Sequence, residues 1–418
     1  MIDKKGFDSI TRRVDAFKDD MIDMQIALTA IPAISPDNGG DGEFEKARYL
    51  SSCLKQMNFP DPIELHAPDE RVSSGIRPNL IFKIPGKNME KTTWFLTHMD
   101  IVPPGDAGLW SENPFKGYVK NGRIYGRGTE DNQQDMVASI FTAKAFLDEG
   151  MVPETSIGLA FVSDEETSSR FGLSYLINHG ENPFRKTDII LVPDLGNADG
   201  TLIEIVEKSI FWLQFKTTGK QCHASMPDLG NNAFQAASHL VVKLNDLHHV
   251  FNAVNSFFDP PVSTFQPTKK ETNIPNINTI PGEDVFYMDC RVLPEYPLSN
   301  VMCEIRDMAD EIERTFGVSI EINSVQKVQA PPPTPHDAPV VLALQQAIRD
   351  VYHIEATPQG IGAGTVAGIF RMHDYPAAVW SRVTHMAHQP DENCTIDNMI
   401  GNAKVFAHLL LQRQGASR

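Results

Sequence analysis

The strongest constraint on the fold is a series of short segments that are apolar throughout. They lie at Leu80–Ile84, Trp94–Thr97, Ile157–Val162 and Ile189–Val192. Between the second and the third, Asp135–Asp148 carries apolar residues at helical spacing and ends just before a glycine. Strands without a polar face, separated by helices, indicate a sheet that is covered on both sides. The sequence therefore predicts an α/β domain with a mixed sheet flanked by helices.

The hydrophobic pattern changes near Ser209 and predicts an inserted α+β unit. Alternating strands and amphipathic helices follow in the order β-α-β-β-α-β, from Phe211 to Ile322, and the Pro-rich segment Ala330–Pro335 is typical of a stiff linker. The helix and strand pattern of the first part then resumes. Because 418 residues are too many for one ordinary core, we expect residues 1–208 and 327–418 to form one domain and residues 209–326 to form an insertion.

Composition excludes several classes of protein. The formal net charge of -17 argues against binding a nucleic-acid backbone. No apolar run approaches the length of a membrane span, and no signal peptide is visible after Met1. The five cysteines include no C-x-x-C pair, which suits a reducing compartment. The sequence predicts a cytoplasmic protein.

Histidine and carboxylate clusters follow the apolar strands, where open α/β sheets place their sites. They are the segments Thr97–Asp100 and Ser163–Glu166, the Gly-rich turn Gly126–Asn132, and Asp194. Each cluster alone is weak evidence: an H-x-D triplet is usually chance, paired glutamates usually face solvent, and a lone histidine such as His388 more often caps a helix or loop. Together they offer the mixed nitrogen and oxygen ligands that suit zinc in a hydrolytic site.

At these residues the chain resembles the M20 family of zinc metallopeptidases. The matching motifs are His98-x-Asp100, Gly126-Arg127-Gly128-x-x-Asp131, Glu165-Glu166 and His388-x-x-Asp391-Glu392. The family includes aminoacylases, acetylornithine deacetylase, succinyl-diaminopimelate desuccinylase, glutamate carboxypeptidase and several dipeptidases. The resemblance covers nearly the whole chain, with the motifs in order.

The resemblance implies two zinc ions per subunit, with cobalt or manganese as possible substitutes. One ion would be held by His98, Asp131 and Asp194, and the other by Asp131, Glu166 and His388, so that Asp131 bridges the pair. Asp100 would orient His98. Glu165 would be the general base that takes a proton from the metal-bridging water. An unusual cis peptide bond is expected between Asp131 and Asn132.

The resemblance also assigns roles to the inserted unit, as a lid and dimerisation domain. His223 would reach the partner subunit's active site and stabilise the oxyanion. Asn278 and Arg291 would contact the substrate. Arg291 would bind the carboxylate of the substrate, although a structural salt bridge is nearly as plausible for this residue. Gly362 and Gly364 would form a floor near the substrate carboxylate. A homodimer is expected through this unit.

The sequence leaves other interpretations open. The segment Gly360–Thr365 loosely resembles a dinucleotide-binding turn, but its last glycine is missing and no clear apolar strand precedes it. A non-catalytic binding protein is a second possibility, although every ligand position carries a competent side chain. Within the enzyme class we favour an N-acyl amino acid deacylase, with a dipeptidase or carboxypeptidase as the alternative. Asp194, where many deacylases of the family carry Glu, favours the peptidases.

Overall fold

The computed structural model describes residues 2–178 and 180–413, which divide into two compact units. The first comprises the described residues up to Ile205, Thr334–Pro358 and those from Ile369 onward. The second comprises Val206–Pro333 and Gln359–Gly368. The segment 359–368, which contains the Gly-rich loop, therefore groups with the second unit, whereas the sequence assigned it to the last part of the first.

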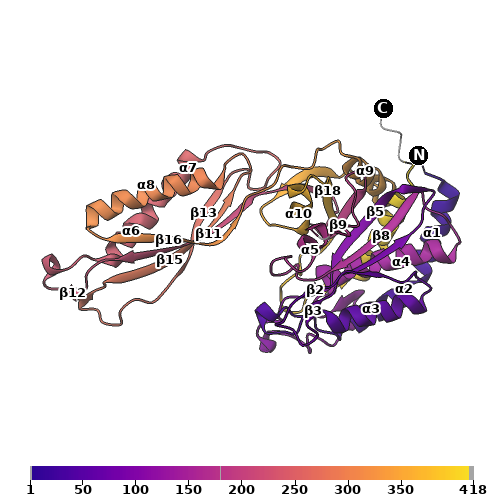
Figure 1. Ribbon diagram of the computed structural model, residues 1–418, viewed down its shortest axis with the longest axis horizontal. Coiled ribbons are helices and arrows are strands. Elements are labelled where there is room, and N and C mark those ends of the chain that lie inside the picture. Colours follow the sequence, from indigo (N-terminus) through magenta and orange to yellow (C-terminus); the bar gives the residue numbers. More distant parts are fainter. Residues whose placement is uncertain (1, 179, 414–418) are drawn as a thin grey trace. The chain divides into compact units, whose positions relative to one another are not determined.

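The first unit is built on an eight-stranded mixed sheet (Figure 1). In spatial order its strands are β1 (Ile63–Glu64), β4 (Leu80–Ile84), β8 (Thr155–Val162), β5 (Asn88–His98), β9 (Ile189–Asn197), β18 (Ala377–Arg382), β10 (Leu202–Glu207) and β17 (Thr357–Ile361). Neighbours among β8, β5, β9 and β18 run parallel, whereas β1 with β4, β4 with β8 and β10 with β18 are antiparallel. The carboxyl ends of the four central strands therefore meet at one edge of the sheet.

Alternate side chains of β5 enter the cores on the two faces of this sheet. Phe95 packs on Phe406, with 4.8 Å between ring centroids, and Trp94 packs on Phe184 at 4.9 Å on the other face. Full burial of each aromatic ring contributes about 1.5–3 kcal/mol to stability. A side chain at Gly158 on β8 would meet the Trp94 ring at 2.2 Å, so glycine is required there. This confirms that the central strands are buried on both faces.

Helices cover both faces of the sheet. Those of the first unit are α1 (Lys4–Ala16), α2 (Lys18–Thr29), α3 (Phe44–Gln56), α4 (Gln134–Asp148), α5 (Leu173–Asn178), α9 (Pro339–Tyr352), α10 (Val366–Met372), which begins in the second unit, and α11 (Ile396–Leu411). Helices α4 and α9 both pack on α11 and on the sheet, while Phe370 of α10 packs on Phe184 over the opposite face. The single helical stretch expected at the N-terminus is two helices, because the backbone leaves helical geometry at Phe17, whose ring packs on Phe141.

Short strands accompany the main sheet. They are β2 (Ala67–Pro68), β3 (Ile76–Arg77), β6 (Tyr118–Lys120), β7 (Arg123–Tyr125) and β19 (Asn393–Thr395). Strand β19 pairs with β7, which brings the segment after His388 beside the segment before Asp131. Two candidate ligand segments that are distant in sequence are thus joined by backbone pairing.

The second unit follows the predicted β-α-β-β-α-β order. Its sheet is antiparallel in the spatial order β13 (Thr264–Lys270), β15 (Glu283–Val292), β11 (Ser209–Thr218) and β16 (Ser319–Val328). Helices α6 (Ala233–Lys243), α7 (Leu247–Val250) and α8 (Leu298–Phe316) accompany it. Alternate residues of β11 enter its core, where the rings of Phe215 and Phe286 stack at 4.6 Å.

Three further features of the fold bear on the sequence predictions. A small ribbon of β12 (Cys222–His223) and β14 (Thr279–Ile280) carries the candidate lid histidine. Strand β17 leads into the Gly-rich loop and shares Gly360 and Ile361 with it, and, as the sequence predicted, it is not an apolar strand. It was missed because only one of its five residues is buried. Among the described residues, no helix is both long and apolar enough to cross a membrane.

Candidate metal centre

Five candidate ligands gather at the carboxyl edge of the central strands. His98 ends β5, Glu166 follows β8 and Asp194 lies within β9. Asp131 lies in the turn Thr129–Gln133 before α4, and His388 lies in the loop between β18 and β19. Because parallel strands end at a common edge, five segments spread over most of the chain meet in one place.

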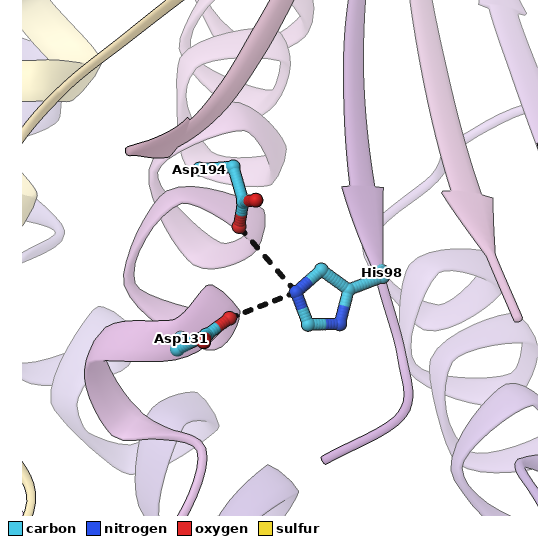
Figure 2. A group of neighbouring side chains, drawn as sticks. All are labelled: His98, Asp131 and Asp194. Carbon is cyan, nitrogen blue, oxygen red and sulfur yellow. Dashed lines mark hydrogen bonds and ion pairs between the residues drawn. The ribbon is translucent and has the colours of Figure 1, made fainter. Parts of the chain in front are cut away.

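The first group of ligand atoms surrounds the imidazole of His98. Its Nε2 lies 2.9 Å from Oδ1 of Asp131 and 3.4 Å from Oδ1 of Asp194. Figure 2 shows both carboxylates directed at this nitrogen. The ligand atoms of the three residues lie within 4.8 Å of one another. One nitrogen and two carboxylate oxygens at this spacing fit a zinc ion.

The second group shares Asp131 with the first. Nε2 of His388 lies 3.1 Å from Oδ2 of Asp131 and 3.1 Å from Oε2 of Glu166. Oε1 of Glu166 is buried and has no hydrogen-bond partner among the described residues, which fits an oxygen that would bind a cation. The two oxygens of Asp131 thus face different histidines. This is the arrangement that a bridging carboxylate requires.

The turn that presents Asp131 depends on its glycines. Gly128 has φ +86°, and a side chain there would come within 2.6 Å of Ile101, so only glycine fits. The Asp131–Asn132 peptide bond is cis, which confirms that prediction. The side-chain amide of Asn132 donates to Asp194 Oδ1 at 2.7 Å and links the bridging turn to the third ligand segment.

Asp100 contacts more than the sequence predicted. Nδ1 of His98 lies 3.0 Å from the backbone carbonyl oxygen of Asp100 and 3.5 Å from its carboxylate, so the shorter contact is to the backbone. A proton on Nδ1 leaves Nε2 free for a metal. The Asp100 carboxylate instead accepts the backbone N–H groups of Glu165 and Glu166, at 3.0 and 2.9 Å. It therefore positions the loop that carries the predicted base.

The candidate ligands perturb one another's pKa values strongly. Burial alone would lower the pKa of His98, but contacts with Asp100, Asp131 and Asp194 raise it well above the usual value. Contacts with Asp131 and Glu166 raise the pKa of His388 to about 10, and burial raises the pKa of Glu166 to about 7. Protons thus compensate the clustered carboxylates. A divalent cation would replace those protons, and its binding would release them.

Glu165 differs from its neighbours because its carboxylate makes no hydrogen bond within the described part of the chain. Burial, followed by the nearby Asp194 carboxylate, raises the pKa of Glu165 well above its usual range. Its backbone is fixed by Asp100, while its carboxylate is unoccupied by protein donors. Such a group can accept and release a proton beside the ligand cluster.

The predicted lid residues lie in the second unit. His223 is exposed on strand β12, and Asn278 is exposed directly before strand β14. Nδ1 of His223 lies 2.8 Å from the hydroxyl of Ser225. Arg291 forms two hydrogen bonds with Asp289, at 2.7 and 3.0 Å, and a third with the carbonyl oxygen of Gly362 at 3.0 Å. The salt bridge that the sequence left open for Arg291 is thus present. Gly364 lies in the same loop as Gly362.

Sequence reasoning gave no role to several buried charges around the centre. Glu130 and Glu392, exposed by 2% and 0%, accept backbone N–H groups from ligand-bearing segments. Lys46 of α3 is fully buried, its ammonium group has no hydrogen-bond partner among the described residues, and burial lowers its pKa to about 8. The only available signal was adjacency, because Glu130 precedes Asp131 and Glu392 belongs to the His388 motif.

Comparison with known proteins identifies the family. The model of peptidase family M20/M25/M40 matches residues 94–412. The chain belongs to this family. An uncharacterized metallohydrolase of Methanococcus maripaludis is 40% identical over 411 residues, which cover 94% of this chain and 99% of that protein. The protein is therefore an enzyme, a metallohydrolase of the M20/M25/M40 family, as the motifs predicted.

More distant relatives agree with this assignment. A succinyl-diaminopimelate desuccinylase of Paracoccus denitrificans is 26% identical over 389 residues, covering 92% of this chain and 95% of that one. The crystal structure of human carnosine dipeptidase 1 superposes with a TM-score of 0.75 at 16% identity, covering 97% and 98% of the two chains. At this identity the structural likeness shows the shared fold alone, and it confirms the predicted α/β fold class.

Proposed function

We propose that this metallohydrolase is a two-zinc deacylase that cleaves the amide bond of an N-acyl amino acid. The observation that carries the proposal is the Asp131 carboxylate, whose two oxygens face His98 and His388 in two adjoining ligand groups. The relative named succinyl-diaminopimelate desuccinylase supports the deacylase branch. Cobalt or manganese could replace zinc on the same ligands.

The proposed chemistry assigns each group a separate task. A bound metal pair would lower the pKa of the attacking water and polarise the scissile carbonyl. Glu165 takes up the water's proton on its free carboxylate and passes it to the leaving amine. Asp100 fixes the backbone of Glu165 and Glu166, so the base and a ligand move as one. His98 presents Nε2 because its Nδ1–H donates a hydrogen bond to the backbone carbonyl of Asp100.

A metallo-dipeptidase or carboxypeptidase is the second candidate, favoured by one residue. Asp194 occupies a ligand position where the family's dipeptidases and aminopeptidases commonly carry Asp and its deacylases Glu. Both reactions cleave an amide beside a carboxylate, so the same ligands and base would serve either. A protein that binds metal or ligand without turnover is the remaining alternative, and the complete ligand set with Glu165 argues against it.

We assign substrate contacts to the second unit. His223 would stabilise the developing oxyanion, and Asn278 would bind the substrate nearby. Arg291 is held by Asp289 and by the carbonyl of Gly362, so it would bind a substrate carboxylate with the two N–H donors that remain. The backbone of Gly362 and Gly364 would form the floor for that carboxylate.

We also propose a homodimer through the second unit. Strand β13 is an edge of the four-stranded sheet, and a cavity of about 410 Å³ lies between β13 and α6. Phe234 and Val242 of α6 are 46% and 68% exposed. An edge strand beside exposed apolar side chains on a helix favours pairing with a second copy.

The function is tested by adding metal back to chelator-treated protein. N-succinyl, N-acetyl and N-formyl amino acids would be assayed beside a dipeptide panel, with Glu165→Gln as the variant that binds metal without turnover. We expect zinc-dependent release of one acyl group and at least a thousandfold lower turnover in Glu165→Gln. Cleavage of dipeptides alone would establish the peptidase alternative. A wild-type protein that binds two ions but hydrolyses neither class would contradict the proposal.

The dimer is tested by placing a charge on each edge of the second unit. Val242→Glu on α6 should shift the protein from dimer to monomer in sedimentation velocity. Val325→Glu, on the opposite edge strand β16 and 58% exposed, should leave the dimer intact. If Val325→Glu dissociates the protein instead, the other edge is the interface. A wild-type monomer at all concentrations would refute the dimer.

A further inference from the structure

The Glu130 carboxylate accepts four hydrogen bonds from the loop that carries His388. Its Oε1 accepts the backbone N–H of Thr384 at 2.5 Å and the Thr384 hydroxyl at 2.8 Å. Its Oε2 accepts the backbone N–H of Ala387 at 3.1 Å and that of Met386. The segment that donates these hydrogen bonds, residues 384–387, ends one residue before His388. Hydrogen bonds to an ionised carboxylate are roughly twice as strong as those between neutral groups.

The Glu392 carboxylate accepts hydrogen bonds from the turn that carries Asp131. One of its oxygens accepts the Arg127 guanidinium at 2.7 Å and the backbone N–H of Gly128 at 2.9 Å. The other accepts the backbone N–H groups of Glu130 and Asp131, at 3.0 and 3.1 Å. Glu392 lies four residues after His388. The loop therefore fixes the turn just as the turn fixes the loop.

The loop needs such support because its backbone is strained. His385, His388 and Asp391 all have positive φ, at 60°, 64° and 54°. Residues other than glycine rarely adopt this region, and it persists only where the surroundings enforce it. The four donors that meet Glu130 lie at the start of this strained segment. Releasing them would let His388 move away from Asp131.

We propose that Glu130 and Glu392 are positioning residues that form a reciprocal clamp between the two ligand segments. The clamp sets Asp131 and His388 at their spacing before any ion binds, so the second metal position is preorganised. Two buried carboxylates beside acidic ligands are costly for folding, and the clamp explains what they contribute. The proposal rests on the metal-ligand roles of Asp131 and His388 given under the proposed function, but it does not depend on the identity of the substrate.

The test measures metal affinity instead of turnover. Glu130→Gln replaces one carboxylate oxygen by an NH₂ group that faces N–H donors, which cannot pair with it. Co²⁺ and Zn²⁺ would be titrated against a competing chelator, and the visible spectrum of the Co²⁺-loaded protein would report coordination geometry. We expect the weaker of the two ions to bind roughly 10- to 100-fold less tightly, with a changed spectrum. Glu392→Gln should behave alike, and the double variant should lose less than the two single losses combined.

Asp188→Asn is the matched control. Asp188 is also buried and accepts three N–H groups, from Thr92 at 2.9 Å, Trp94 at 2.8 Å and Arg185 at 2.9 Å, but it lies near the start of β9, away from every candidate ligand. It should lower stability to urea as the clamp variants do, yet keep the metal affinities and the Co²⁺ spectrum of the wild type. This comparison separates positioning of ligands from general support of the fold.

A milder variant covers the case in which Glu130→Gln does not fold. Thr384→Val removes only the hydroxyl donor to Glu130. It should lower the affinity for the more weakly bound ion roughly two- to tenfold. Wild-type affinity and spectrum in folded Glu130→Gln, or in Thr384→Val where only that variant folds, would overturn the clamp. A wild type that binds no metal pair would overturn it as well. Two bound ions without hydrolysis would contradict the proposed function alone.

Discussion

The first unit holds its candidate histidine ligands through hydrogen bonds and ion pairs, whereas the second displays its candidate catalytic histidine at the surface. His98 is 2% exposed and contacts two carboxylates, and even the half-exposed His388 lies in a loop held by Glu130. His223, in contrast, is exposed on a two-residue ribbon strand, and among the described residues its imidazole has hydrogen bonds only with Ser225.

The difference separates metal binding from the catalytic contribution of His223. The ligand geometry is complete within the first unit, so affinity for metal should be a property of that unit alone. An exposed histidine acts only when a substrate or another chain reaches it. We therefore expect variants of the ligand segments in the first unit, and of the residues that hold them, to change metal binding, and variants on the β12–β14 ribbon to change turnover only.

The sharpest test of this comparison is His223→Ala. If His223 supplies one donor to the oxyanion, its loss should lower kcat by about 10²- to 10³-fold. Metal affinity and the urea midpoint should not change, because the side chain is exposed. His249→Ala, another exposed histidine of the second unit, is the matched control and should behave as wild type. A loss of metal affinity in His223→Ala would break the proposed separation of the units.

Mixing two inactive variants tests whether His223 acts on the partner subunit. Subunits of His223→Ala and Glu165→Gln would be combined after reversible dissociation. Random pairing of dimers gives one intact combination in roughly a quarter of the active sites if His223 acts across the dimer. Recovered activity near that fraction supports action in trans. No recovery in proven heterodimers would show that His223 serves its own subunit.

The sequence predicted where the candidate ligand segments lie because strand periodicity fixes where strands end. His98 and Glu166 follow apolar runs, and parallel strands bring such ends to one edge. The α/β class and the order of elements in the insertion followed from the same periodicity. The metal-centre assignment itself needed the family resemblance, since each cluster alone was ambiguous.

The supporting contacts could not be predicted in the same way. Glu130 and the segment after Val383 are about 250 positions apart, and only the tertiary fold shows that one accepts N–H groups from the other. The main contact of Asp100 is with the backbone N–H groups of Glu165 and Glu166. Almost every residue type carries a backbone N–H, so the sequence cannot reveal such a contact. Strand β17 was missed because its residues lack the apolar pattern of a buried strand.

The smallest effect concerns pH and again belongs to the first unit. Asp135 is fully buried, accepts hydrogen bonds from Ser381 and Asn402 at 2.6 and 2.8 Å, and has a pKa that burial raises to about 7. Its pKa in the unfolded chain is about 3.9. Between these values the folded state binds more protons, so stability falls as pH rises from about 4 to about 7 and then levels off. Asp135→Asn removes this titration. The stability of the variant relative to wild type should therefore rise by on the order of 1–3 kcal/mol across that window.

Urea unfolding in the presence of chelator measures this difference, and Ser381→Ala provides the control. That variant removes a hydroxyl that stabilises the charged carboxylate, so it should keep the fall in stability and extend it above pH 7. Opposite behaviour of the two variants would assign the pH dependence to Asp135. If Asp135→Asn keeps the wild-type slope, the dependence arises in the ligand cluster instead. The acidic groups that prepare the first unit for metal would then also set its stability, a cost that the exposed ribbon of the second unit does not carry.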